Sequence, residues 1–234
     1  MDTPLTTTEN RTFCGRNIAL AVLVLGSLWG VAEVVLNDAV KAADLPFRAG
    51  ILTGAGMLTM GILLGYARRP LAIIAVPLIA VVIKQLVVPL VGAPVACKAN
   101  SCIAVLLEGS VLAGVVTLSR RFVGRRLSAR VAAGGGSGLL AAVPFYFIGL
   151  AVAPCNYLMS FSRAGGFADF MIQEGLVWAA FSAVLFPLGF ALGARARAPL
   201  AVMELRRPLA FRATAIGVAA CCWVIASLAI LAGA

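Results

Sequence analysis

The sequence contains no histidine and few charged residues. None of its 234 positions is His, and Asp, Glu, Lys and Arg make up 12% of the chain, against about a quarter in a soluble globular protein. The absence of His excludes His-ligated haem, the commonest zinc and copper sites and the usual proton switch near neutral pH. The low charge and 62% hydrophobic content exclude an ordinary soluble enzyme, a disordered tail and a DNA-binding domain, despite a formal net charge of +10.

Signatures of nucleotide and metal binding are also missing. No GxxxxGK[ST] phosphate loop occurs, so the chain is not expected to hydrolyse a nucleotide by itself. The cysteines do not have the spacing of a paired CxxC metal site. We expect a protein that is not an enzyme, with no catalytic residues, no cofactor, no metal site and no nucleic-acid partner. The six cysteines are Cys14, Cys97, Cys102, Cys155, Cys221 and Cys222.

Long apolar runs dominate what remains, and the mean hydropathy is +1.04. A helix needs about 20 apolar residues to cross about 30 Å of hydrocarbon. The sequence therefore predicts an all-α polytopic transmembrane bundle of about seven spans, with six as the alternative count. We expect one integral membrane domain over residues 1–234, with a tail at 1–17, four spans within 18–118 and three within 131–232. The predicted spans are 18–36, 47–66, 71–91, 101–118, 131–153, 170–192 and 211–232.

The basic residues alternate between loops in the way that seven spans require. The amino-terminal tail and the loops on its side of the membrane carry 14 of the 19 Lys and Arg residues, the opposite side carries four, and Lys84 lies inside a span. Cytoplasmic loops of membrane proteins are enriched in Lys and Arg. We therefore place the amino terminus in the cytoplasm and the carboxyl terminus outside, in a multi-pass protein of the bacterial inner (plasma) membrane in contact with lipid. Binding of the arginines to lipid headgroups or a partner is the alternative explanation.

Glycines recur four positions apart in several spans. Without Cβ atoms on one face, two helix backbones can approach closely in lipid. Such pairs indicate either packing within the bundle or a docking face for another membrane subunit. The pairs are Gly26 and Gly30, Gly50 and Gly54, Gly61 and Gly65, and Gly189 and Gly193.

Four ionisable residues fall inside predicted spans, where each costs about 2.5–3.5 kcal/mol on insertion scales. Counted at 1.5 Å per residue, all four lie roughly 5 to 11 Å below the outer boundary. They therefore form a layer near one face rather than a pathway across the membrane, and such a layer suits a pocket open to the outside. The four residues are Glu33, Lys84, Glu108 and Glu174.

Polar and aromatic residues surround this layer. An excess of carboxylates in a site of low dielectric must be protonated or must meet a cation, which favours a small cationic ligand. An indole face would add cation–π attraction. The structural alternative is a buried ion pair between Lys84 and Glu108 that fixes helix register. The predicted ligand-binding residues are Glu33, Lys84, Glu108, Glu174, Trp29, Asn100 and Arg48.

Cys97 and Cys102 enclose four residues of a predicted outer loop. If the topology is right, they face an oxidising compartment, where disulfides persist. The two cysteines are therefore candidates for a disulfide that clamps this loop beside Glu108.

Three stretches of the first four spans resemble the substrate-binding S components of energy-coupling factor transporters, and related small bacterial membrane proteins of uncertain function. The stretches are 27–33 (SLWGVAE), 45–50 (LPFRAG) and 100–109 (NSCIAVLLEG). The resemblance implies a six-helix bundle that captures a vitamin or metal ion from outside. It also implies docking onto a transmembrane coupling subunit driven by two cytosolic ATPases.

The chain departs from that family pattern in three respects. It has a predicted seventh span, it has no amino-terminal His of the kind that a nickel- or cobalt-specific member supplies, and it shows no clear alanine-rich docking motif on its first helix. Gly26 and Gly30 would have to replace that motif. The sequence thus favours a substrate-capturing subunit of an uptake transporter, binding a small-molecule solute such as a cationic vitamin-like compound. The alternative is a non-transporting accessory subunit of a membrane complex.

Overall fold

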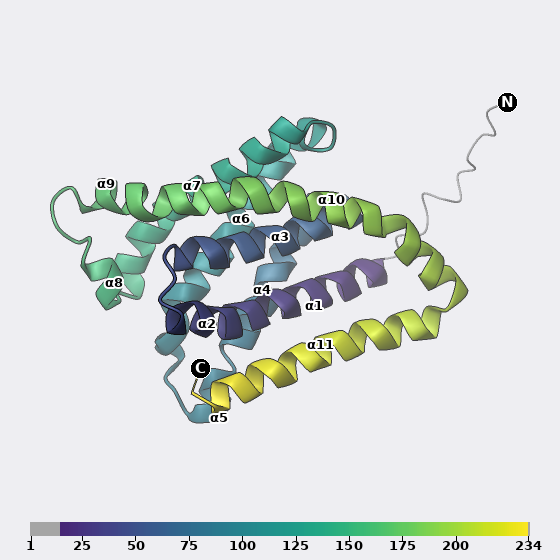
Figure 1. Ribbon diagram of the computed structural model, residues 1–234, viewed down its shortest axis with the longest axis horizontal. Coiled ribbons are helices and arrows are strands. Elements are labelled where there is room, and N and C mark those ends of the chain that lie inside the picture. Colours follow the sequence, from purple (N-terminus) through teal and green to yellow (C-terminus); the bar gives the residue numbers. More distant parts are fainter. Residues whose placement is uncertain (1–14, 234) are drawn as a thin grey trace.

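The computed structural model describes residues 15–233, and these form helices joined by short turns, without a strand (Figure 1). Cys14 and most of the predicted tail lie outside the described residues. Seven helical segments are long and apolar enough to cross a membrane, which confirms the all-α polytopic prediction. The segments are Asn17–Ala42, Arg48–Ala67, Pro70–Val91, Val95–Val123, Leu127–Val152, Gly166–Arg206 and Pro208–Leu231.

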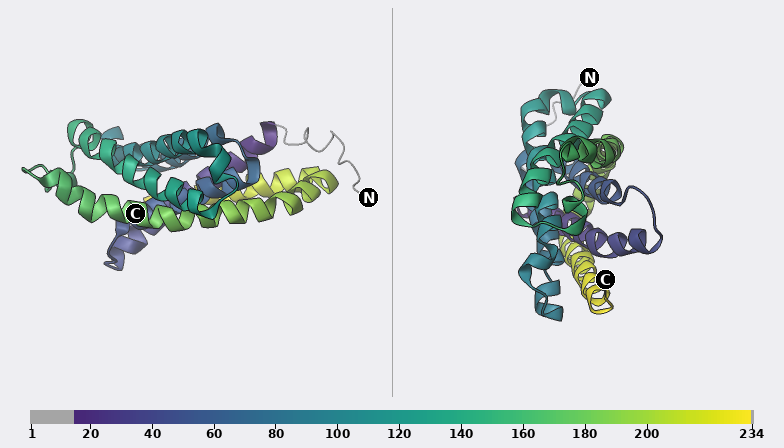
Figure 2. Two further views of the ribbon diagram at one scale, coloured as in Figure 1. Left: turned by 90° about the horizontal axis from the view of Figure 1, so that it is seen from above. Right: turned by 90° about the vertical axis from the view of Figure 1, so that its left-hand side faces the viewer.

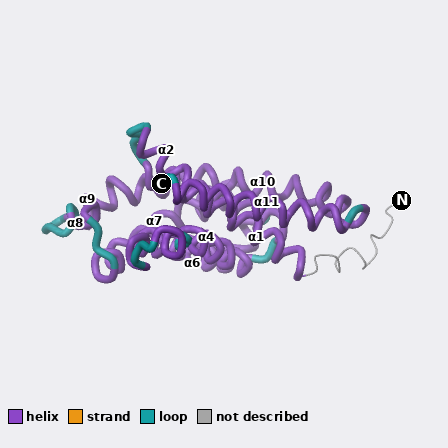
Figure 3. Tube along the Cα trace, turned by 90° about the horizontal axis from the view of Figure 1, so that it is seen from below, coloured by secondary structure: helices purple, strands orange, loops and turns teal. Residues whose placement is uncertain are grey.

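The first and third spans are interrupted near the same end of the bundle, whereas the second is one continuous helix. The first span leaves regular α-helical geometry in a π-helical turn, and the third breaks after Lys84. Figure 3 shows α2 projecting away from the common direction of the long helices. In chain order the elements are α1 (Gly15–Val31), η2 (Ala32–Leu36), α2 (Asn37–Ala42), α3 (Arg48–Ala67), η3 (Pro70–Ile74), α4 (Ala75–Lys84) and α5 (Val87–Val91).

The last four spans include the longest helix. The segment Gly166–Arg206 has 41 residues, or about 60 Å at 1.5 Å per residue, twice the hydrocarbon thickness. The prediction that this span ends at residue 192 is therefore wrong as a helix boundary, since the helix continues through Arg195 and Arg197. The elements are η4 (Val95–Lys98), α6 (Ala99–Val123), α7 (Leu127–Val152), α8 (Asn156–Met159), α9 (Gly166–Phe170), η5 (Met171–Gly175), α10 (Leu176–Arg206) and α11 (Pro208–Leu231).

Glycines bring α3 and α10 into backbone contact, and Figures 1 and 2 show these two helices side by side. A Cβ atom placed on Gly65 would lie 2.2 Å from the carbonyl oxygen of Phe190. A Cβ on Gly193 would lie 2.0 Å from the carbonyl oxygen of Ile62. The predicted pairs on these two spans therefore pack against each other. They serve the interior of the bundle and are not available as a docking face.

The pair on α1 is also occupied. A Cβ on Gly26 would lie 2.6 Å from Cβ of Ile79, and one on Gly30 would lie 2.7 Å from Cδ1 of Ile83. Both contacts are to α4, which packs along α1. The docking role that the family resemblance gave to Gly26 and Gly30 is therefore wrong for this structure, because α4 already covers that face.

Arg130 joins three helices at the end of the bundle that the topology assigns to the cytoplasm. Its Nε donates to the carbonyl oxygen of Val123 at 2.8 Å and its Nη2 to that of Gly124 at 3.2 Å, so it caps the last turn of α6. Its guanidinium carbon also lies 4.1 Å from the ring centroid of Phe190 on α10. One basic side chain of α7 thus fixes this end of both neighbouring helices.

Helix α11 lies on the flank of the other six spans and packs on α1 (Figure 1). Only 22% of its most apolar stretch is buried inside the protein. Its exposed side chains include Ile216, Val224 and Leu228, which suit contact with lipid. The described chain starts with α1 at one end of the bundle, and α11 finishes at the other, as an odd number of spans requires.

Candidate functional site

A cavity of about 420 Å³ lies at the end of the bundle where the predicted topology places the outer face. Its volume falls within the range of small-molecule sites, about 300–1,000 Å³. All seven spans contribute to its wall, together with the loop between α7 and α9. The cavity brings together six of the seven predicted site residues, namely Glu33, Arg48, Lys84, Asn100, Glu108 and Glu174.

Trp29, the seventh predicted residue, does not line the cavity. It is fully buried, and its indole Nε1 donates a hydrogen bond of 3.1 Å to Oε1 of Glu33. Its ring packs over Gly56, where a Cβ atom would lie 2.3 Å from Cζ2 of the indole. The prediction that Trp29 contacts a ligand is therefore wrong for this structure. Trp29 instead orients the carboxylate of Glu33 through this hydrogen bond.

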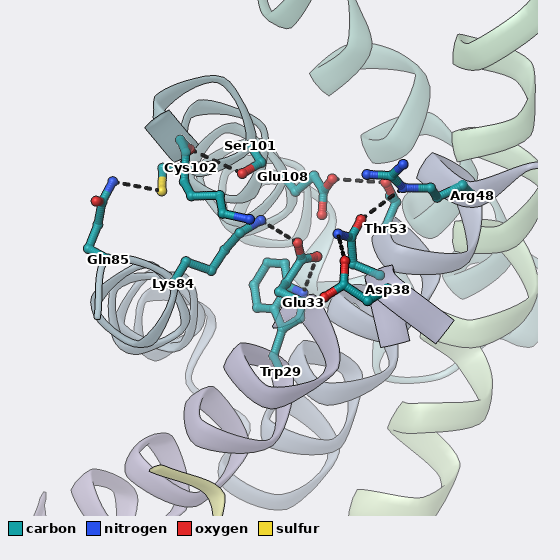
Figure 4. A network of polar contacts seen from close by, with 12 residues as sticks. Trp29, Glu33, Asp38, Arg48, Thr53, Lys84, Gln85, Ser101, Cys102 and Glu108 are labelled. Atoms are coloured by element: carbon teal, nitrogen blue, oxygen red, sulfur yellow. Dashed lines mark hydrogen bonds and ion pairs between the residues drawn. The ribbon is translucent and has the colours of Figure 1, made fainter. Parts of the chain in front are cut away.

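Lys84 pairs with Glu33 rather than with Glu108. Its Nζ lies 2.5 Å from Oε2 of Glu33, and both side chains are almost fully buried (Figure 4). The Lys84–Glu108 ion pair, which was the structural alternative, is therefore wrong. The reason is that α4 packs along α1. The π-helical turn η2 continues α1, and this places Glu33 beside Lys84 at the end of α4.

Glu108, like Glu174, has no ion pair with the described residues, and it is the more deeply buried of the two. Thr53 on α3 donates a hydrogen bond of 2.9 Å to its Oε1 (Figure 4). Its Oε2 has no hydrogen-bond partner among the described residues, and the whole residue is only 3% exposed. A buried polar atom without a partner costs about 1–3 kcal/mol and requires an explanation.

Glu174 is held by the loop between α7 and α9, which contributes Cys155 and Tyr157 to the cavity wall. The hydroxyl of Tyr157 in α8 donates a hydrogen bond to its Oε1. Burial, and then the hydrogen bond to Glu174, raise the pKa of Tyr157 well above that of a free phenol. Tyr157 therefore remains protonated and acts as a donor to this carboxyl group throughout the ordinary pH range.

Three aromatic side chains form an apolar part of the wall. The ring centroids of Phe145 and Trp178 are 5.3 Å apart, and those of Phe145 and Phe170 are 6.2 Å apart. All three residues are buried from bulk solvent and line the cavity. The position of Trp178 one turn from Glu174 was a usable sequence signal. Nothing distinguished Phe145 and Phe170 from the other phenylalanines of the spans.

Two of the intramembrane carboxylates lie in π-helical turns. Glu33 is in η2 and Glu174 is in η5. Such turns occur mostly as single interruptions of α-helices and are frequent at functional sites. Irregular backbone at membrane depth is tolerated where it lines a cavity or is buried in protein. The two π-helical turns thus lie where the chain lines the cavity. No sequence pattern predicted these turns.

The cavity contains more positive charge than the sequence indicated. Lys98 lines the wall in addition to Lys84 and Arg48, so three cationic side chains face three carboxylates. The predicted excess of acids is therefore wrong. Arg163, in the loop before Glu174, forms an exposed ion pair of 2.7 Å with Asp169.

The outer cysteines are not joined. Cys97 is exposed and Cys102 is buried, and both are free thiols in the structure. The sulfur of Cys102 accepts a contact of 3.3 Å from Nε2 of Gln85, so it faces α4 and not the loop. The predicted disulfide is therefore wrong for this structure. Cys155 lines the cavity and accepts a hydrogen bond of 3.0 Å from Nδ2 of Asn100.

Comparison of the chain with protein-family models, with curated proteins and with solved structures gives no match in any of the three. The resemblance to S components therefore stays a prediction.

Proposed function

We propose that the protein is a membrane-embedded subunit that captures a small solute from the outer side of the membrane for uptake. The observation that carries this proposal is Glu108, a buried cavity carboxylate with one oxygen unpartnered among the described residues. A bound solute with an N–H or O–H group would supply the missing partner. Binding of a ligand thus offsets the free-energy cost of leaving Oε2 of Glu108 buried without a hydrogen-bond partner.

The position of the charged residues supports capture from one side. The charged and polar groups of the cavity gather at one end of the bundle, and the positive-inside rule assigns that end to the outside. A carrier that moves protons or ions through the bilayer would need polar groups along its whole depth. A receptor that hands its solute to another subunit needs them at one end.

We propose further that the protein works as S components do, with a transmembrane coupling subunit and cytosolic ATPases as partners. The chain itself has no phosphate loop, so the proposed role includes no catalysis by this subunit. Because the glycine pairs of α1, α3 and α10 pack inside the bundle, docking must use other helix faces.

Identification of the bound solute by mass spectrometry tests the proposal. The protein is purified in mild detergent and denatured, and the released small molecules are compared with those from two variants. Glu108→Gln preserves the acceptor for Thr53 but removes the charge, whereas Glu204→Gln is a matched change at the opposite end of the bundle. We expect one compound at near-equimolar yield from wild type and Glu204→Gln, and its loss from Glu108→Gln. Equal yield from all three proteins would contradict the assigned role of Glu108.

The alternative, a non-transporting accessory subunit, is favoured by the enclosed Lys84–Glu33 pair. With Trp29 behind it, this pair is satisfied without any ligand and can serve to hold α1 against α4. Purification from native membranes separates the two proposals. A stable complex that lacks any ATPase, together with no released solute, would favour the accessory role.

A further inference from the structure

We infer that the solute bound by this cavity is a small aromatic zwitterion, with a cationic nitrogen at one end and an acidic group at the other. This inference rests on the proposed capture function and specifies its substrate class. It replaces the cationic ligand expected from the sequence. The charged groups of the cavity that lack a partner within the protein determine what a ligand must supply.

One of the three carboxylates, Glu33, is fully satisfied inside the protein, and a second, Glu174, is satisfied at one oxygen only. Glu33 accepts hydrogen bonds from Lys84 and Trp29, and Oε1 of Glu174 accepts one from Tyr157. Both sets of partners come from the protein's own helices. Oε2 of Glu108 and Oε2 of Glu174 both have no hydrogen-bond partner among the described residues, but Glu108 is the more deeply buried of the two. A ligand therefore gains most by contacting Glu108.

Glu108 is placed to bind a cationic nitrogen. Thr53 fixes one carboxylate oxygen, so the orientation of the other is set before a ligand arrives. A charged N–H donor at this buried oxygen forms a charge-assisted hydrogen bond, which is stronger than one between neutral groups. The carboxylate then neutralises the donor in a region where an isolated charge would be costly.

The two remaining cations of the wall call for an acidic group on the ligand. Lys98 forms no ion pair with the described residues. Arg48 uses its Nε to donate to Oδ1 of Asn37 at 2.8 Å, while its two terminal nitrogens make no hydrogen bond with the described residues. Figure 4 shows the guanidinium of Arg48 directed toward the network around Glu108. A guanidinium fork of this kind matches the geometry of a carboxylate.

The aromatic side chains indicate what joins the two charged ends. Phe145, Phe170 and Trp178 line the same cavity and present ring surfaces with few polar atoms. A flat aromatic ring gains from tilted or offset contact with such a wall, about 0.5–1.5 kcal/mol for each pair beyond burial. A zwitterion also adds no net charge to a cavity in which three acids already face three cations.

Three matched probes separate the contributions of the two ends. We would measure binding of 4-(aminomethyl)benzoate, benzylamine and benzoate to the full chain in detergent, by calorimetry and thermal shift. We expect the zwitterion to bind about tenfold or more tightly than either half-probe, because each of those leaves one charged group unmatched. The double variant Lys98→Ala with Arg48→Ala should reduce the affinity for 4-(aminomethyl)benzoate to that for benzylamine. Glu108→Gln should reduce the affinity for 4-(aminomethyl)benzoate to that for benzoate. Lys41 is an exposed cation outside this cavity, so Lys41→Ala should leave the affinities for all three probes unchanged.

The outcomes distinguish a wrong substrate class from a wrong function. If benzylamine binds as tightly as the zwitterion and loses affinity in Glu108→Gln, capture stands and the zwitterion is overturned. If no probe binds but wild type releases a native compound, capture also stands and the inference is wrong. If no probe binds and no compound is released, both the inference and the capture function fail.

Discussion

Nζ of Lys84 lies 2.5 Å from Oε2 of Glu33, although the two residues come from different spans and are 51 positions apart. Both side chains are withdrawn from solvent. A buried pair of this kind adds little net stability compared with an apolar contact, but loss of one partner leaves a charge stranded in a medium of low dielectric. The pair therefore makes α1 and α4 dependent on each other at the cavity.

Replacement of Lys84 alone should destabilise the protein strongly. We expect Lys84→Met to lower the free energy of unfolding by about 3–5 kcal/mol, because Glu33 is left buried without its counter-charge. Reversible unfolding in mixed detergent measures the effect. The double variant Glu33→Gln with Lys84→Met should recover most of the loss, and Lys41→Met should be neutral. A single variant as stable as wild type would show that the pair does not form.

A methyl group at Gly56 should displace Trp29. The added Cβ would lie 2.3 Å from the indole ring, which is itself fully buried. Overpacking of this kind costs about 1–3 kcal/mol, and we expect Gly56→Ala to lower the thermal midpoint accordingly. Gly114→Ala is the matched control, since nothing lies within 4 Å of its added Cβ. Equal midpoints for the two variants would contradict the packing of Trp29 on α3.

Loss of the Tyr157 hydroxyl should open the outer end of the cavity. Tyr157→Phe removes the hydrogen bond between the outer loop and Glu174. We expect a small thiol reagent to modify Cys155, which lines the cavity, several times faster in this variant. Peptide mass spectrometry after timed labelling gives the rate, and Ser162→Ala, which loses only a local bond in the same loop, is the control.

The same hydrogen bond should not depend on pH under ordinary conditions. Because burial raises the pKa of Tyr157, the phenol remains a donor from about pH 5 to pH 9. The ratio of Cys155 labelling rates between Tyr157→Phe and wild type should therefore stay constant over this range. A ratio that falls toward one as the pH rises would show that the phenol ionises and that the loop detaches in wild type as well.

The assigned orientation predicts which loops a reagent can reach from outside the cell. In a background with Cys97→Ser and Cys155→Ser, which removes the two free thiols at the outer end that are not buried, we expect Arg163→Cys to react with a membrane-impermeant maleimide in intact cells. Arg125→Cys should react only after the membrane is permeabilised. The opposite pattern would reverse the topology and place the cavity on the cytoplasmic side.

The sequence was sufficient to identify the spans and every charged residue of the cavity wall except Lys98. Charged residues in apolar runs are conspicuous because insertion penalises them. Distance from the span ends then gave a common depth for Glu33, Lys84, Glu108 and Glu174. All four line the same cavity in the structure.

Depth alone did not determine which of these residues touch. Lys84 and Glu108 lie on consecutive antiparallel helices at similar depth, yet the ion pair forms with Glu33. The direction in which each side chain points depends on helix rotation and on the π-helical turn at η2, and neither has a sequence signature. Thr53 and Lys98 were missed for a related reason, since an isolated threonine or a loop lysine carries no periodic signal.

The contact between α3 and α10 limits how the cavity can change shape. Where backbone meets backbone at Gly61, Gly65, Gly189 and Gly193, neither helix can slide without a clash, so the two move as one rigid body. Thr53 and Glu174 are carried by this body, whereas Glu33 and Lys84 belong to the α1–α4 unit. Entry and release of a solute must therefore come from displacement of the α1–α4 unit or of the outer loop. The fixed body would then provide the reference against which the rest of the molecule opens.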